Sequence, residues 1–307
     1  MINTRNKNTG IYTGIMMLIA AVMIIFWAIQ LGGENTPRVW RAFFINYLFF
    51  TSAAAGLVVW PAIITTAGGD WMGSLEKVCW SGMAFSIPSL VALIVLWTSA
   101  DNWAPWLEAE SHNSWWLNNP FLFLRNFLMQ AIFWTLAWVF LQKRFSPKKH
   151  VYGAWLAFLY AITFSLAGFD FIMPLELEWK SMVVGGYFFI SGLYIAAAAW
   201  AFISIVSMKP DTKILRTIAK LVFVFCLLTT YLMMSQLLPT WYGNQPHETV
   251  FLIPRINFSW EKISHLLLVM VYLGPIPLLV SGWSKRTPYF LGIVTLMILT
   301  EIGRAHV

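Results

Sequence analysis

The chain has 307 residues, of which 59% are hydrophobic and only 11% are charged, and it contains 24 Phe and 18 Trp. A soluble domain of this size could not bury so much apolar surface, so the composition indicates an integral membrane protein. The formal net charge of +7 raises the question of nucleic-acid binding, but the distribution of the charges along the chain follows a membrane topology instead, and we expect no nucleic-acid partner.

Nine apolar runs predict membrane-spanning helices, because a bilayer core requires about 20 apolar residues per helix. They lie at residues 11–31, 42–66, 78–99, 120–142, 152–173, 182–206, 217–240, 263–283 and 288–300, the last being short. None alternates as barrel strands do. The first run is longer than the apolar part of a signal peptide, so we expect a retained helix. The sequence therefore predicts an all-α, polytopic transmembrane helix bundle, embedded in lipid as a single domain over residues 1–300.

The charged residues predict the orientation of these helices. With a cytoplasmic N-terminus, the cytoplasmic segments together with Lys220 hold 13 of the 20 Lys and Arg, but only three acidic residues. The segments on the opposite side hold nine acidic residues and six basic ones. An excess of Lys and Arg on the cytoplasmic side is typical of membrane proteins, so we predict that the N-terminus is cytoplasmic.

The chain offers few ligands for a metal or a haem. Cys79 and Cys226 are far apart and support neither a disulfide framework nor a thiolate metal site. Among the five histidines, only His265 enters a predicted helix, whereas a haem between helices needs axial ligands from facing helices. We therefore expect no metal site and no tightly bound cofactor.

Polar residues within the apolar runs are candidates for function, because an ionisable side chain at membrane depth costs about 2.5–3.5 kcal/mol on insertion scales. Arg125 and His265 lie near helix ends, where their side chains can extend to the interface. Asn46 and Gln130 are uncharged and fit hydrogen bonds between helices.

Asp170 differs from these residues. It follows an apolar run, precedes Pro174 and has a side chain too short to reach far toward water. A carboxylate partly removed from water at the mouth of a helix bundle can accept and release protons. Glu176 and Glu178 extend the acidic strip outward, although an acidic loop on the outer side also follows from the charge distribution alone.

Two long outer links, at residues 101–120 and 241–260, are rich in Trp and other aromatic residues. They fit either an interfacial aromatic belt or a docking surface for an extracytoplasmic partner. Gly186, Gly192 and Ala196 to Ala199 lie on one apolar run and predict close packing between helices.

Three stretches resemble a known family. They are NNPFLFLRNFLMQAIFW at 118–134, FDFIMPLELEWKSMVVGGYFFISG at 169–192 and TYLMMSQLLPTWYGNQPHETVFLIPRI at 230–256. They resemble motifs of ActF, a membrane subunit of alternative complex III, which is a quinol:cytochrome c oxidoreductase of the respiratory chain. The similarity covers about residues 37–300, in the same order. More remotely, the fold is similar to the NrfD and polysulfide reductase C membrane subunits.

The resemblance implies one NrfD-like transmembrane domain of two four-helix bundles plus extra helices, about ten helices in the family against about nine in this chain. It implies the bacterial inner (cytoplasmic) membrane. It also implies partners: a related NrfD-like membrane subunit, and extracytoplasmic iron-sulfur and multihaem cytochrome c subunits that hold the haem and iron-sulfur groups for electron transport. In the family the related subunit is the better candidate for quinol oxidation, and the ActF-type subunit is more often given a structural or proton-conducting part.

The residues and the resemblance together predict a proton-conducting or quinol-facing cavity. Its candidate residues are Asp170, Glu176, Gln236, Arg255 and Arg125. Where the family has Asp-Pro-His before a Trp, this chain has Glu176, Leu177 and Glu178, so a proton route through that histidine is lost while one through Asp170 and Glu176 remains. Quinone or quinol is the expected ligand, and no residue is assigned as catalytic.

Two other functions stay open at this stage. One is a non-catalytic scaffold that anchors the extracytoplasmic subunits. The other is an independent ion or solute transporter, which is disfavoured because the two halves of the sequence show no inverted repeat and no matching broken helices.

The last seven residues, EIGRAHV at 301–307, end the ninth run abruptly. One reading frame of a common sequencing adapter encodes the same residues. We therefore expect residues 301–307 not to be native, and the natural chain to continue past Thr300 into a further helix.

Overall fold

The structure is a computed structural model that describes residues 22, 25, 27–33, 36–107, 115–177, 179–208, 210–249, 253, 261–282 and 287–300. Throughout these residues the secondary structure is helical, with no strand. Arg255, Glu178, residues 301–307 and most of the first predicted run lie outside the described residues.

Seven segments of the described chain are long and apolar enough to cross a membrane. They are α2 (Thr36–Thr66); Gly73–Thr98, made of η1 (Gly73–Leu75), α3 (Glu76–Trp80), η2 (Ser81–Phe85) and α4 (Ser86–Thr98); α5 (Asn119–Lys143); α6 (Lys149–Ala167) with η5 (Gly168–Ile172) and η6 (Met173–Leu175); α7 (Val184–Met208); α8 (Thr212–Gly243); and α11 (Glu261–Leu267) with η8 (Leu268–Leu273) and α12 (Pro275–Val280). These spans confirm the second to eighth predicted runs.

One shorter apolar helix and three short helices in the connections complete the described elements. The ninth predicted run is confirmed as a shorter apolar helix, α13 (Pro288–Leu299). Short helices lie in two of the connections: η3 (Ala100–Asn102), η4 (Pro105–Leu107) and α9 (Pro246–Thr249). The chain is therefore a multi-pass helical membrane protein.

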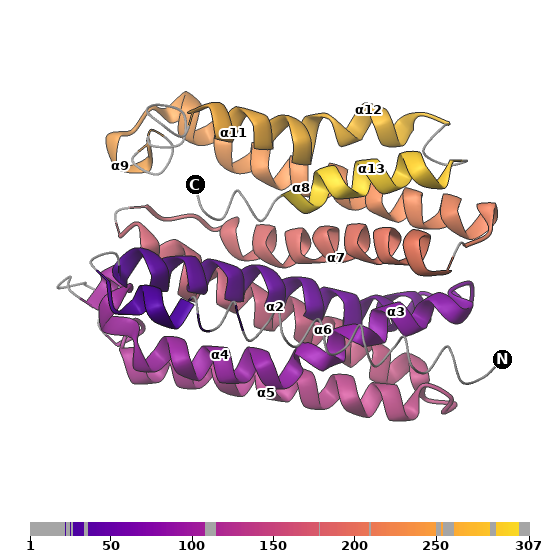
Figure 1. The fold of residues 1–307 in the computed structure, drawn as a ribbon, viewed down its shortest axis with the longest axis horizontal. Coiled ribbons are helices and arrows are strands. Elements are labelled where there is room, and N and C mark those ends of the chain that lie inside the picture. The colour runs from indigo at the N-terminus through magenta and orange to yellow at the C-terminus, as the bar shows by residue number, and fades with distance from the viewer. Residues whose placement is uncertain are drawn as a thin grey trace.

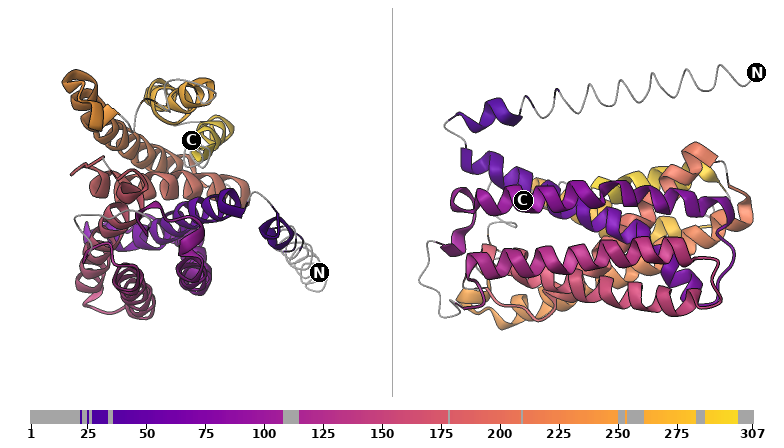
Figure 2. Two further views of the ribbon diagram at one scale, coloured as in Figure 1. Left: turned by 90° about the vertical axis from the view of Figure 1, so that its left-hand side faces the viewer. Right: turned by 90° about the horizontal axis from the view of Figure 1, so that it is seen from below.

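The helices form two groups of four that lie side by side. The first bundle consists of α2, the α3–α4 span, α5 and α6, and the second consists of α7, α8, the α11–α12 span and α13 (Figures 1 and 2). The bundles meet mainly where α7 packs against α2 and α6. This arrangement agrees with the expectation of two four-helix bundles.

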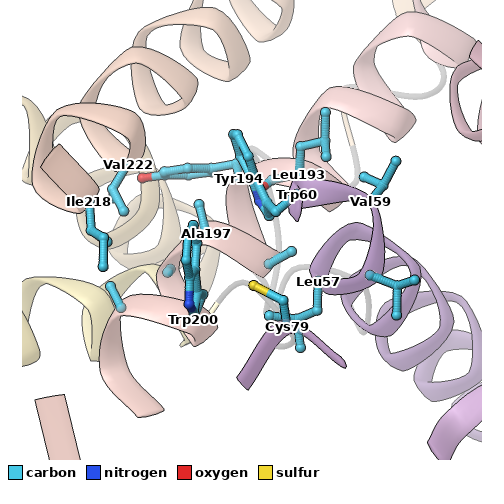
Figure 3. Close-up of a cluster of buried hydrophobic side chains, with 14 of the residues drawn as sticks. Leu57, Val59, Trp60, Cys79, Leu193, Tyr194, Ala197, Trp200, Ile218 and Val222 are labelled. Carbon is cyan, nitrogen blue, oxygen red and sulfur yellow. The ribbon is translucent and has the colours of Figure 1, made fainter. Parts of the chain in front are cut away.

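The seam between the bundles depends on small residues. A Cβ atom added at Gly56 of α2 would lie 2.7 Å from the Cβ of Ala196 and 2.8 Å from the carbonyl oxygen of Gly192, both on α7. The Trp60 indole, also on α2, donates to the carbonyl of Leu193 at 3.2 Å, and Figure 3 shows Trp60 and Leu193 in the shared core. Gly192 and Ala196 therefore pack as the sequence predicts.

Gly186 does not share this role. No atom lies within 4 Å of a Cβ added there, so its predicted part in close helix packing is wrong. Gly186 belongs to the first turn of α7, beyond the region where that helix crosses α2 at Gly56.

Charge separates the two ends of the molecule. We call one end the basic end, after Lys143, Arg144, Lys148, Lys149 and Lys213, which lie where α5 meets α6 and where α8 begins. We call the other the acidic end, because it holds Asp101, Asp170, Glu176, Glu248 and Glu261, although Arg38, Arg41, Lys180 and Lys262 lie there too, so that this end is less basic than the first and not uniformly acidic. The connections of the antiparallel helices gather at these opposite ends, as Figure 1 shows.

The first long aromatic link folds into the protein. Trp103 and Trp106, in and beside η3 and η4, are buried in a hydrophobic cluster at the acidic end. The Trp103 ring stacks on Phe44 with centroids 4.3 Å apart, and its indole donates to the Leu96 carbonyl. These two residues form core rather than an interfacial belt or a docking surface. Trp115, farther along the link, is 68% exposed.

Candidate functional site

Asp170 lies on a single turn of π-helix, η5, that directly follows α6. Pro174 follows four residues later and has no N–H, so the α-helical donor to the Asp170 carbonyl is absent. The Met173 N–H bonds instead to the carbonyl of Gly168, five residues back. Such π-helical turns occur often at functional sites, because they redirect the side chains that they carry.

The π-helical turn packs closely against the start of α7. A Cβ at Gly168 would lie 3.1 Å from the Cα of Gly185, and one at Gly185 would lie 2.5 Å from the Phe169 ring. The two glycines therefore allow η5 and α7 to approach, and in this position the Asp170 side chain is fully buried.

Arg125 of α5 forms an ion pair with the buried carboxylate. Its Nη2 lies 2.5 Å from Oδ1 of Asp170, and its Nε donates to Oδ2 at 2.8 Å. This two-point geometry suits the planar guanidinium. The Arg125 side chain is only 11% exposed, so it turns into the bundle instead of extending to the interface.

Two further residues donate to the same carboxylate. Asn126, also on α5, donates from Nδ2 to Oδ2 at 2.6 Å, and the Trp116 indole donates to Oδ1 at 3.1 Å. The Trp116 ring also stacks on the guanidinium, 3.9 Å from Cζ, and its carbonyl accepts a hydrogen bond from Arg125 Nη1 at 2.9 Å. Each carboxylate oxygen therefore accepts two hydrogen bonds, and its charge is balanced by the guanidinium.

The beginning of α5 positions Arg125 and Asn126. The Asn118 side chain caps the helix by accepting from the Phe121 N–H at 3.3 Å, and Pro120 occupies the first turn, where a missing N–H costs nothing. The cap fixes the start of the helix, so that the two donors follow about two turns later and face η5.

A pocket of about 400 Å³ opens beside the ion pair. It is lined by Trp115, Trp116, Phe169 and Met173. It is a shallow, open hollow with an almost entirely apolar lining, whereas typical small-molecule sites enclose most of their ligand and add a few polar groups. Trp116 is both a wall of the pocket and a donor to Asp170.

Of the remaining predicted site residues, Glu176 and Gln236 make no hydrogen bond to this centre, and Arg255 lies outside the described residues. Glu176 is half-buried just after η6, and no hydrogen bond or ion pair of its carboxylate occurs among the described residues. Gln236 of the second bundle accepts a hydrogen bond from the Ser181 hydroxyl. The structure therefore unites Arg125 with Asp170 and places Gln236 on a different helix pair.

Sequence reasoning missed Trp116 and Asn126. Asn126 follows Arg125 directly in an otherwise apolar run, and this neighbouring pair of polar residues was the available signal. Trp116 lies in an aromatic link where several tryptophans alternate with polar residues, so nothing in the sequence distinguishes it.

A second polar group lies in the second bundle, on another π-helical turn. The hydroxyl oxygens of Tyr187 on α7 and Tyr272 on η8 are 2.5 Å apart. Pro275 removes the α-helical donor to the Val271 carbonyl, and this carbonyl accepts from the Tyr194 hydroxyl at 2.9 Å. The Tyr194 hydroxyl thus satisfies a backbone carbonyl where the proline interrupts the helix.

Within the described part of the chain, no three His, Cys, Asp or Glu side chains gather closely enough to hold a metal ion. No protein-family profile matches the chain, and no curated protein matches it in sequence. The fold and the composition together make it an integral, multi-pass, helical membrane protein.

Proposed function

We propose that this protein is an integral membrane subunit of a quinol-oxidising respiratory complex, a quinol:cytochrome c oxidoreductase. In this proposal it contributes a quinol-facing or proton-conducting cavity and anchors extracytoplasmic redox subunits. The observation that carries the proposal is the fully buried Asp170 carboxylate, held by Arg125 and Asn126 beside an aromatic pocket at the acidic end.

The chemistry of quinol oxidation requires a proton acceptor near the ring, because two protons leave with each pair of electrons. Of the residues that donate to Asp170, Trp116 also lines the pocket. Movement of its indole exposes Oδ1 of Asp170 to a hydroxyl of a bound ring. In this proposal Arg125 keeps the carboxylate in place while the proton is exchanged.

Polar groups deeper in the first bundle support a proton-conducting role. Gln130 lies one turn beyond Asn126 on α5 and donates to the Tyr47 hydroxyl at 2.6 Å. The buried side-chain oxygens of Gln130, Thr51 and Thr163 have no hydrogen-bond partner in the described structure. Buried polar groups of this kind are commonly satisfied by ordered water, which conducts protons along hydrogen bonds.

The partners in this proposal are a related NrfD-like membrane subunit and extracytoplasmic iron-sulfur and multihaem cytochrome c subunits. The latter would receive the electrons. Trp241 and Tyr242, at the end of α8, are 66% and 86% exposed at the acidic end. These aromatic side chains favour contact with a protein or a headgroup layer on that side.

The test is the Asp170→Asn variant in the assembled complex. We expect quinol:cytochrome c activity to fall by about a hundredfold, the usual scale for removing a proton-transfer group. Haem content and co-purification of the other subunits should stay at the wild-type level. Asp101→Asn is the matched control, because Asp101 is exposed at the same end. Wild-type turnover in Asp170→Asn would remove Asp170 from the mechanism.

A specific observation favours a second candidate, a non-catalytic scaffold. Every oxygen of the Asp170 carboxylate is already hydrogen-bonded, as expected of a structural ion pair. A scaffold predicts normal turnover in Asp170→Asn complexes that assemble, and loss of the extracytoplasmic subunits when Trp241 and Tyr242 are replaced by Ala. The two candidates thus predict opposite results for turnover and assembly.

A further inference from the structure

The connection between α5 and α6 concentrates positive charge at the basic end. We call residues 143–150, KRFSPKKH, the α5–α6 turn. It contains Lys143, Arg144, Lys148, Lys149 and His150, and no acidic residue. By contrast, the connection that follows α2 includes Asp70, and the one that precedes α8 includes Asp211.

These basic side chains have no counter-charge within the described part of the chain. The only ion pair among the described residues joins Arg125 to Asp170, at the other end of α5. Lys143 and Lys148 are exposed, and Arg144 and Lys149 are half-buried. Like charges held close together repel one another, so an anion from outside the chain would stabilise the α5–α6 turn.

Backbone hydrogen bonds hold the α5–α6 turn in a fixed shape. The Ser146 N–H donates to the Lys143 carbonyl at 2.8 Å, and the Lys149 N–H donates to the Ser146 carbonyl at 3.0 Å. The Nδ1 of His150 lies 2.7 Å from the carbonyl oxygen of Thr65, at the end of α2. Because the backbone is already ordered, an anion can bind without the entropic cost of ordering a loop.

Two tryptophans indicate the depth of the α5–α6 turn in the membrane. Trp138 on α5 and Trp155 on α6 are both exposed, and Trp side chains prefer the boundary between hydrocarbon and headgroups. At about 1.5 Å per residue, Lys143 lies about 7.5 Å beyond Trp138, and Lys149 about 9 Å beyond Trp155. A headgroup layer is about 5–8 Å thick on each side of a bilayer. The basic side chains therefore lie at the level of the lipid phosphates.

An apolar stripe on α6 continues from the α5–α6 turn into the membrane. Val151, Trp155 and Phe158 recur every three or four residues and are each more than half exposed. Lys148 precedes Val151 by three residues, so it stands at the head of this stripe. A surface with cations above and apolar side chains below fits an amphiphile with an anionic head and hydrocarbon chains. Free phosphate or an acidic soluble protein would use the cations alone.

We infer that the α5–α6 turn binds an anionic phospholipid. Its phosphate lies among the four Lys and Arg side chains, and one of its acyl chains follows Val151, Trp155 and Phe158 along α6. Clusters of Lys and Arg next to a membrane span attract anionic lipids in this way. This inference does not depend on quinol chemistry.

The test is native mass spectrometry of the purified full chain in mild detergent. The chain is titrated with phosphatidylglycerol, which is anionic, and with phosphatidylcholine of the same acyl chains, which carries no net charge. We expect phosphatidylglycerol to bind at least about tenfold more tightly, because the four Lys and Arg attract only the anionic lipid. Glycerol phosphate at the same concentration should not displace it, because this headgroup lacks the acyl chains.

The Lys148→Gln, Lys149→Gln double variant should weaken phosphatidylglycerol binding by about thirtyfold, the scale for two basic side chains near an anionic membrane surface. The matched control is Lys213→Gln, Lys220→Gln, which removes the same charge from exposed positions of α8 and should bind as the unmodified chain does.

A second double variant separates charge from folding. Lys148→Arg, Lys149→Arg keeps both positive charges and should bind phosphatidylglycerol as tightly as the unmodified chain. Equal binding of the two lipids, displacement by glycerol phosphate, equal weakening in the α8 control, or weakening in the Arg variant as large as in the Gln variant would each overturn the inference.

Discussion

At the scale of single residues, the most important polar contact is the buried ion pair between Asp170 and Arg125. A buried ion pair adds little net stability when compared with apolar residues of the same size, but loss of one partner leaves an uncompensated charge in the interior. Here the carboxylate is fully buried and the guanidinium nearly so. The two residues are therefore energetically coupled.

Arg125→Ala should lower the free energy of unfolding by about 3–5 kcal/mol, because Asp170 loses its counter-charge. The Arg125→Ala, Asp170→Ala double variant should lose less than the two single variants summed. The measurement is unfolding in mixed detergent micelles. Lys213→Ala, at an exposed position of the basic end, serves as the control. Strict additivity of the two single losses would mean that the residues do not interact.

At the scale of helices, the seam between α2 and α7 shows which small residues matter. Gly56 faces Gly192 and Ala196 with no room for a Cβ, whereas Gly186 faces open space. Glycine is therefore required at position 56 but replaceable at position 186. The difference is that residues of the other helix contact Gly56 and no atom lies close to Gly186.

Gly56→Ala should destabilise the protein by about 1–3 kcal/mol, because the added methyl group meets backbone and Cβ atoms that cannot rotate away. Gly186→Ala, the matched control, should leave stability unchanged or raise it by up to about 1 kcal/mol, since Ala is the better helix former. Thermal unfolding in detergent compares the two variants. Equal melting temperatures would contradict the tight seam.

The π-helical turn of η8 gives another prediction at this scale. Tyr194→Phe removes the hydroxyl that donates to the Val271 carbonyl, freed by Pro275. We expect a loss of about 1 kcal/mol in the free energy of unfolding. Tyr289→Phe should have no effect, because Tyr289 is 83% exposed at the start of α13. Equal free energies of unfolding for Tyr194→Phe and Tyr289→Phe would show that this hydrogen bond does not contribute to stability.

At the scale of the whole molecule, the two ends differ in charge, and the basic end should face the cytoplasm. The native thiols of Cys79 and Cys226 are completely buried, so engineered cysteines can report the orientation without background labelling. Pro147 lies in an exposed turn at the basic end, and Gln245 is exposed at the acidic end.

A membrane-impermeant maleimide should label Gln245→Cys in intact cells, and should label Pro147→Cys only after the membrane is permeabilised. The unmodified protein is the control, because both of its cysteines are buried and it should not be labelled. The opposite pattern would reverse the predicted orientation and place the aromatic pocket of Trp115 and Trp116 on the cytoplasmic side.

The sequence by itself determined the all-α membrane class, the positions of the spans from α2 to α13, and the separation of charge between the two ends. These properties are local, because each helix must satisfy its own backbone hydrogen bonds and match the bilayer thickness with its own residues. The sequence also showed that Asp170 is the acidic residue at the end of an apolar run, because that property too depends only on neighbouring residues in the chain.

Only the tertiary structure decided which side chains meet. Asp170 and Arg125 are 45 positions apart, and their contact depends on how α5 lies beside the π-helical turn of η5. The burial of Trp103 and Trp106 and the open space beside Gly186 were decided in the same way. Lateral packing of helices depends on the shapes of both surfaces at once, and one stretch of sequence contains only one of them.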